Sequence, residues 1–194
     1  MQHSIQNKEN GFTLVELLIA ITIGLIVLGV LVSTFIIQRK TYDVQEQLTE
    51  MVQNARAAMD IITREALMAG FNPSGAAFNG IPYSAGQLQI SADLNGNGVT
   101  TDTNENIVYT FDGANLEIDR DTGGGAQTLA KNIQAFSFSY LDGGGNPTII
   151  TANVRQIQIA ITARTAKLDS EYDANGGYRT YTLTSLITPK NLSL

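Results

Sequence analysis

The chain contains 194 residues, of which 43% are hydrophobic and 15% are charged, a composition typical of folded rather than disordered proteins. Its net charge is −6 with only 12 Lys and Arg residues, and no basic run is interleaved with aromatic residues, so we expect no direct binding of nucleic acid. The absence of Cys excludes disulfides, thiolate metal sites and a Cys nucleophile.

An apolar segment near the N-terminus has the length of a membrane-spanning helix. No charged residue occurs from 17 to 37, and roughly 20 apolar residues are needed to cross the core of a bilayer as a helix. A cleavable secretory signal would have a basic leading region, a shorter apolar core and a small-x-small cleavage site, and none of these is present. We therefore predict a retained membrane helix. The flanking charges, Lys8 and Glu9 before it and Arg39 and Lys40 after it, do not decide its orientation.

Beyond the apolar segment the helical pattern continues but becomes one-sided. Apolar residues recur at steps of three and four, as on one face of an amphipathic helix: Val44, Leu48, Met51, Ala55, Met59, Ile62 and Ala66. The opposite face is polar: Glu46, Glu50, Gln53, Asp60 and Arg64. Gly70 stands where a helix commonly ends, and Pro73 follows it. We predict one helix that is membrane-spanning over 12–38 and amphipathic over 39–70.

The rest of the chain has the period-two alternation of β-strands. Such segments are IQAFSFSYL, NVRQIQIAITAR, RTYTLTSLIT and NIVYTF, and a DGAN turn after the last leads into LEI. Clusters of Gly with Asn, Asp or Gln begin at 123, 142 and 173. We predict an α+β fold in which four to six antiparallel strands pack by one face onto the amphipathic half of the helix. The head would occupy 71–194, and the loop over 71–84 has no assignable pattern.

Two stretches of the sequence carry a resemblance to a known family. In KENGFTLVELLIAITIGLIVLGVLV, a short leader ending in Gly11 is followed by an aromatic residue, Thr, Leu, any residue, Glu16 and a long apolar run. This pattern is similar to the N-terminus of type IV prepilins and type II secretion pseudopilins. Further on, QNARAAMDIITREALMAGFNPSG resembles the helix end of PilW-type minor pilins, with an Arg-Ala-Ala segment and an Ala-Gly-aromatic break. J-type pseudopilins share the same general plan.

The resemblance implies a processing site and a topology. Residues 1–11 would be a cytoplasmic leader that a membrane-embedded prepilin peptidase cleaves between Gly11 and Phe12, and the new amino group of Phe12 would be N-methylated. The helix would cross the inner membrane once with the head in the periplasm, and the subunit would later lie in a pilus at the cell surface. The implied partners are major and minor pilins, the peptidase and the pilus assembly platform.

Glu16 is the one carboxylate at the start of the apolar segment. A carboxylate inside a bilayer costs a few kcal/mol and usually faces a partner. Cleavage would create an α-amino group on Phe12 with a pKa of about 8, mostly cationic at neutral pH, and Glu16 lies four residues further along the same helix face. We expect Glu16 to pair with the amine of its own chain or of a neighbouring subunit, and the resemblance implies the neighbour. The alternative is a Glu that merely reaches the headgroup level.

A loop over 93–105 has the first half of a calcium-binding pattern. The six positions from Asp93 to Gly98 reproduce D-x-[DN]-x-[DN]-G, in which oxygens at alternate positions converge and Gly makes the sharp turn. The closing Glu belongs at 104, but the chain has Asn104 there and Glu105 one residue late. The candidate ligands are Asp93, Asn95, Asn97, Asp102 and Glu105. The alternative is an Asn/Gly-rich turn between strands with no metal.

The function expected from these features is structural. The only His is His3 in the leader, and neither GxxxxGK[ST] nor G-x-S-x-G occurs, so nothing indicates an enzyme. The resemblance implies a minor pilin that primes or caps assembly of a type IV pilus and so supports adhesion, twitching motility or DNA uptake. Two alternatives stay open: a J-type pseudopilin of a type II secretion system, and a membrane-anchored periplasmic binding domain that does not polymerise.

Overall fold

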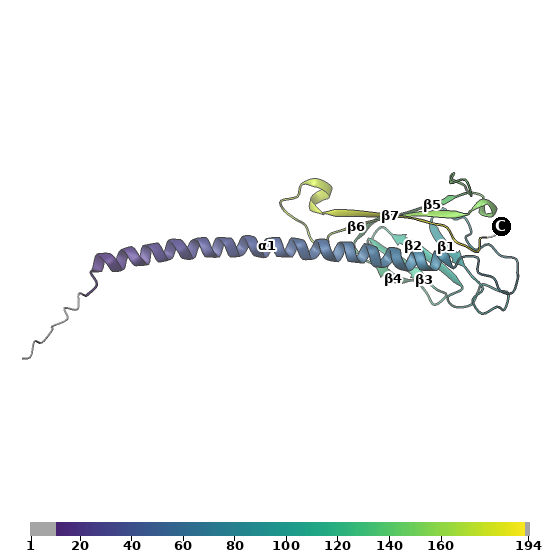
Figure 1. The fold of residues 1–194 in the computed structure, drawn as a ribbon, viewed down its shortest axis with the longest axis horizontal. Helices are drawn as coiled ribbons and strands as arrows, with labels where there is room; N and C mark the ends of the chain where they lie inside the picture. The colour runs from purple at the N-terminus through teal and green to yellow at the C-terminus, as the bar shows by residue number, and fades with distance from the viewer. Residues whose placement is uncertain (1–10, 193–194) are drawn as a thin grey trace, which may run out of the picture. The chain divides into compact units, whose positions relative to one another are not determined.

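The computed structural model describes residues 11–192 (Figure 1). The chain divides into two compact units, residues 1–45 and 46–194. One helix, α1 (Leu14–Leu67), supplies residues 14–45 to the first unit and residues 46–67 to the second. The predicted leader and His3 lie outside the described residues, with the exception of Gly11.

The first unit is an apolar helix. Residues 11–39 are all exposed in the isolated chain, and α1 is the one helix in the described part that is long and apolar enough to cross a membrane by length and composition. Within the uncharged run 17–37, the hydroxyls of Thr22, Ser33 and Thr34 each donate a hydrogen bond of 2.8–2.9 Å to the backbone carbonyl four residues earlier. These polar groups are thus satisfied inside the helix, as an apolar environment requires.

In the second unit α1 buries one face, as predicted. The buried residues are Met51, Ala55, Ala58, Met59, Ile62 and Ala66, and Leu48 is partly buried beside them. The predicted stripe is confirmed over this part of the helix. After Leu67 the chain turns, and Gly70 adopts a left-handed conformation with φ of +76°. The amide of Gly70 donates a hydrogen bond to the carbonyl of Ser91, which ties the end of the helix to the first sheet.

The first sheet has four antiparallel strands in sequential order: β1 (Gln87–Ser91), β2 (Asn106–Asp112), β3 (Glu117–Asp121) and β4 (Gln127–Ala130). The predicted DGAN turn connects β2 to β3, where the Asp112 carboxylate accepts hydrogen bonds from the amides of Ala114 and Asn115. This side-chain contact stabilises the tight turn because it satisfies two backbone donors. A register shift between Ile118 and Asp119 interrupts the pairing of β3 with β4.

The second sheet has three antiparallel strands: β5 (Ile133–Leu141), β6 (Gln156–Arg164) and β7 (Thr180–Ile187). Two short 3-10 helices, η1 (Thr151–Asn153) and η2 (Ala174–Gly177), lie in its connections. Along β6, Ile157, Ile159 and Ile161 are fully buried while the residues between them are less buried or exposed. One core cluster joins side chains from α1, both sheets and the loop at Ile81.

The α+β fold with antiparallel strands packed on the amphipathic part of the helix is confirmed, but the predicted strand number is corrected. Within residues 11–192, seven strands form two sheets, instead of four to six strands in one. The strands that the prediction lacked are β1 and β4, which have only 5 and 4 residues. Such short segments do not establish an alternation by themselves, and they become strands because β2 and β3 offer them edges to pair with.

Candidate functional site

The start of α1 is closed by a reciprocal pair of residues, Thr13 and Glu16. The amide and the hydroxyl of Thr13 donate hydrogen bonds of 2.9 and 2.8 Å to Glu16 Oε2, and the amide of Glu16 donates one of 3.3 Å to Thr13 Oγ1. This arrangement is a capping box, in which the side chains at the first and fourth positions satisfy each other's free amides. It explains physically how a carboxylate stabilises the first turn of an apolar helix.

The predicted processing site lies directly before this cap and is accessible. Phe12 is 87% exposed, and a Cβ built on Gly11 would meet no atom within 4 Å. In the uncleaved chain the nitrogen of Phe12 belongs to the peptide bond with Gly11, so the amine predicted to pair with Glu16 does not yet exist. Cleavage, methylation and the docking role of Glu16 therefore stay predictions.

Sequence reasoning missed Thr13, although its signal was present. A Ser or Thr followed three residues later by Glu or Gln, directly before an apolar run, is the sequence signature of a capping box. The stretch TLVE, residues 13–16, has this spacing. Because the interpretation of Glu16 rested on its distance from Phe12, the closer partner at Thr13 was overlooked.

The loop over 93–105 is organised around the buried side chain of Asp93. Its Oδ1 accepts hydrogen bonds from the amides of Gly96 and Asn97 at 2.8 and 3.1 Å, and its Oδ2 accepts them from the Ser74 hydroxyl at 2.6 Å and the Gly98 amide at 3.1 Å. These donors, the Ser74 hydroxyl foremost, hold the pKa of Asp93 below its ordinary range despite the burial.

The other predicted ligands lie in the same loop. The side-chain amides of Asn95 and Asn97 donate hydrogen bonds of 2.8 and 2.7 Å to Asp102 Oδ2. Glu105 is only 2% exposed, and its Oε1 accepts hydrogen bonds from the amides of Leu94 and Asn95. Within residues 11–192, no three His, Cys, Asp or Glu side chains gather as a metal site would need, so a cation here would also require amide oxygens.

A second polar cluster joins the end of α1 to the first sheet. Arg120 on β3 donates to both carboxylate oxygens of Glu65, and the Tyr109 hydroxyl on β2 donates to Glu65 Oε2. Burial of the Tyr109 hydroxyl is the main cause that raises its pKa, and the neighbouring Glu65 carboxylate raises it further. Beside the cluster lies a cavity of about 380 Å³ with mostly apolar walls, which Glu105 also lines.

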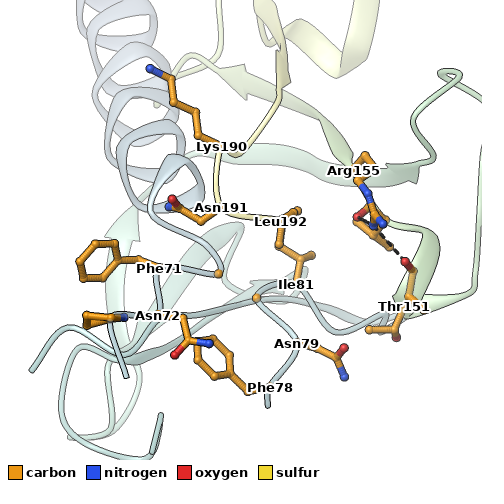
Figure 2. Close-up of a pocket in the computed structure, with 15 residues that line it drawn as sticks. Phe71, Asn72, Phe78, Asn79, Ile81, Thr151, Arg155, Lys190, Asn191 and Leu192 are labelled. Carbon is orange, nitrogen blue, oxygen red and sulfur yellow. Dashed lines mark hydrogen bonds between the residues drawn. The ribbon is translucent and has the colours of Figure 1, made fainter. Parts of the chain in front are cut away.

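At the end of the head the chain forms an open groove of about 550 Å³ (Figure 2). It is lined by segments 70–73, 78–81, 151–155 and 190–192. Figure 2 shows aromatic and amide side chains on one side of it and Arg155 on the other. The Arg155 guanidinium donates to two backbone carbonyls of its own loop, so its position is fixed at the rim. No pattern in the sequence had indicated this groove.

Comparison with known proteins identifies the N-terminal segment. Residues 6–32 match the family described as the prokaryotic N-terminal methylation motif. This stretch contains both the predicted processing site and the capping box, and the predicted type IV prepilin-like N-terminus is thereby confirmed. The match covers residues 6–11 of the predicted leader and α1 up to residue 32, and it ends before the head.

The structure is similar to a type IV-like pilin from Thermus thermophilus. The two share 13% sequence identity with a TM-score of 0.43, and the similarity covers 73% of this chain and 98% of that one. Among curated proteins, the sequence has no significant match.

Proposed function

We propose that this chain is a PilW-type minor pilin that primes or caps the assembly of a type IV pilus. The observation that carries the proposal is a methylation motif that continues into a helix with apolar side chains exposed on every face. So large an apolar surface requires lipid or other apolar helices to cover it. A helix that is first covered by lipid and then by neighbouring pilin helices meets this requirement at both stages.

The proposed topology and partners follow from the same segment. The leader is cytoplasmic, α1 crosses the inner membrane once, and the head is periplasmic before the subunit enters a pilus at the cell surface. The partners are the prepilin peptidase, the assembly platform and other major and minor pilins. The role is structural rather than catalytic. The PilW subtype is supported by QNARAAMD, residues 53–60, which lies in the part of α1 that packs into the head with Ala55, Ala58 and Met59 buried, and by the Ala-Gly-Phe turn at 69–71.

Glu16 is the proposed docking residue, and its capping role is compatible with docking. Both hydrogen bonds from Thr13 are made to Oε2, which leaves Oε1 to accept a bond from another donor. The methylated amine of Phe12 in a neighbouring subunit is that donor in our proposal. Pairing the two charges inside the apolar layer would remove the cost that each has when it is alone.

The first experiment is mass spectrometry of the mature N-terminus, on protein taken from membranes and from sheared fibres. We expect a chain that begins at Phe12 and carries one added methyl group, in both fractions. The matched variant is Gly11→Leu, because the open space around Gly11 means that any loss of cleavage reflects the peptidase and not misfolding. A mature protein that still begins at Met1 would contradict the prepilin assignment.

The second experiment separates docking from helix capping. Glu16→Gln removes the charge that docking needs, whereas Thr13→Val removes only the hydroxyl of the cap. We expect Glu16→Gln to abolish incorporation into fibres and Thr13→Val to retain it. Equal losses would show that the helix start, and not a charge pair, is what incorporation requires.

The remaining alternatives are distinguished by where the processed chain is found. Recovery from the pseudopilus of a secretion system, with none in pili, would favour a J-type pseudopilin. Recovery of the processed chain from membranes alone would favour a membrane-anchored binding domain, and the groove of about 550 Å³ would then be the first place to look for its ligand.

A further inference from the structure

One oxygen in the head lacks a partner in a place where this is costly. Glu105 Oε2 is buried and accepts no hydrogen bond from the described residues, while Oε1 of the same carboxylate accepts two. An unpaired buried carboxylate oxygen costs several kcal/mol unless a proton, a water molecule or a cation compensates it. The carboxylate lies against the backbone of Leu94 and Asn95 at the base of the loop over 93–105. It also lines the cavity beside Arg120, but Arg120 donates no hydrogen bond to its free oxygen.

The same loop contains three carboxylates and no Lys or Arg of its own. In the described structure, Asp93, Asp102 and Glu105 accept their hydrogen bonds only from uncharged amide and hydroxyl groups. The side-chain amides of Asn95 and Asn97 both turn toward Asp102 Oδ2, so this oxygen attracts the positive ends of two dipoles. The oxygens of these two side chains accept hydrogen bonds from the amides of Asn97 and Val99. A half rotation of each side chain would exchange its nitrogen and oxygen, so that it gives up that bond and presents an oxygen to a cation beside Asp102.

We propose that the loop over 93–105 binds one calcium ion, with Asp102 and Glu105 as carboxylate ligands and Asn95 and Asn97 supplying amide oxygens. Calcium accepts six to eight oxygen ligands in flexible geometry, and a loop rich in Asn and Gly can supply side-chain and backbone oxygens together. Magnesium requires near-ideal octahedral geometry and retains several waters, which suits this loop less well.

Asp93 holds the loop in shape in this proposal. Each of its oxygens already accepts two hydrogen bonds from the protein. Gly96 and Gly98 have φ of +78° and +84°, a conformation that favours glycine, and it directs their amides and that of Asn97 onto Asp93. The backbone of the loop is therefore organised before an ion arrives, which lowers the entropic cost of binding, and only the side chains of Asn95 and Asn97 have to rotate.

The chain contains a control loop with similar turn chemistry. Asp142 accepts hydrogen bonds from the amides of Gly144 and Asn146, much as Asp93 does from its own loop. In that loop no second carboxylate is present and no buried oxygen lacks a partner among the described residues. We therefore expect Asp142→Asn to leave calcium binding unchanged.

The test uses the full-length protein in detergent micelles after treatment with EDTA. Calcium chloride is titrated by isothermal calorimetry, and the Tm is measured with calcium and with magnesium. We expect one site with a Kd on the order of 0.1–1 mM, the range of extracellular calcium modules, and a rise in Tm with calcium that magnesium does not reproduce. Asp102→Asn and Glu105→Gln should each weaken binding about tenfold or more, since ligand charge sets affinity.

Three results would overturn the proposal. The first is no heat and no change in Tm up to about 10 mM calcium, well above the expected affinity. The second is an equal effect of magnesium, which would indicate screening of charge. The third is unchanged affinity in Asp102→Asn. Because residue 102 is exposed, this variant should fold even if Glu105→Gln does not. None of these outcomes bears on cleavage or docking at the N-terminus.

Discussion

Arg120 holds Glu65 through two nitrogens, with 3.1 Å from Nε to Oε2 and 2.5 Å from Nη2 to Oε1. The pair links the last turns of α1 to the third strand of the first sheet, across 55 residues of sequence. The side chains are 28% and 20% exposed, so water screens the pair only in part. A two-point contact of this kind also fixes the direction of both side chains.

We expect Arg120→Ala to lower the free energy of unfolding by about 2 kcal/mol, the typical value of hydrogen bonds to a charged group. The loss has two parts: the pair itself and the carboxylate that Arg120 leaves behind in a half-buried site. The matched control is Arg64→Ala, which breaks an exposed pair with Asp60 on the same helix and should cost below about 1 kcal/mol. Urea unfolding of the protein in micelles measures both, and equal losses would contradict the structural role of Arg120.

Gly80 is required by a close approach of two backbones. A Cβ at this position would lie 2.6 Å from the Gly70 Cα and 2.7 Å from a side-chain carbon of Leu192. We expect Gly80→Ala to destabilise the head by about 2 kcal/mol or more, because a well-packed site gives way only at the cost of strain. Gly86→Ala is the control, since a Cβ there meets nothing within 4 Å, and it should change stability by less than about 0.5 kcal/mol. Thermal unfolding distinguishes the two.

Asp93 should make the stability of the head depend on acid pH. Its folded pKa lies below its unfolded pKa of about 3.9, mainly because of the Ser74 hydroxyl, so its stabilising effect is complete above that pH and is lost as the pH falls through the folded pKa. Asp93→Asn should therefore be less stable at neutral pH and show a shallower loss below about pH 3.9. Ser74→Ala should change the stability at neutral pH and its loss in acid in the same direction as Asp93→Asn, but by a smaller amount. The measurement is the urea midpoint of each protein between pH 2 and 7. Parallel pH profiles for the unsubstituted protein and Asp93→Asn would contradict the prediction.

Ile159 occupies the centre of the buried face of β6. It is fully buried and pairs with Phe138 on one side and Ser185 on the other. Ile159→Ala should cost about 3 kcal/mol, from lost burial and the cavity that remains. The adjacent Gln158→Ala faces solvent and should stay within about 0.5 kcal/mol. A small effect at Ile159 would mean that the two sheets do not share the core described above.

The parts of the fold that could be predicted from sequence are those where burial imposes a period. The segment IQAFSFSYL coincides with β5 at both ends, and the helical stripe from Met51 to Ala66 is buried as its spacing indicated. In each case the element is long enough for apolar residues to recur several times at the spacing of its buried face. The division into two sheets has no such local signal, because it depends on which strand edges find each other.

The features that escaped prediction are contacts between distant or singular residues. No sequence pattern around Glu65 predicts its contact with Arg120, and none around Gly80 predicts its contact with Gly70. Both contacts arise only when the chain folds. Thr13 is different, since its spacing from Glu16 could have been read directly from TLVE. The calcium pattern was visible at Asp93, but the unpaired oxygen of Glu105 becomes known only once its burial is known.

The hydroxyls of Thr22, Ser33 and Thr34 are bound to carbonyls of their own helix, and this limits what the span can recognise. Sliding a neighbouring helix along it would exchange one set of aliphatic contacts for another of similar energy. In the proposed assembly, moving that helix past Glu16 would instead leave its carboxylate without the amine of the neighbouring subunit. The longitudinal position of one subunit against the next would then be set at Glu16 alone. The rest of the span would impose no register, because its aliphatic contacts have similar energies at every position.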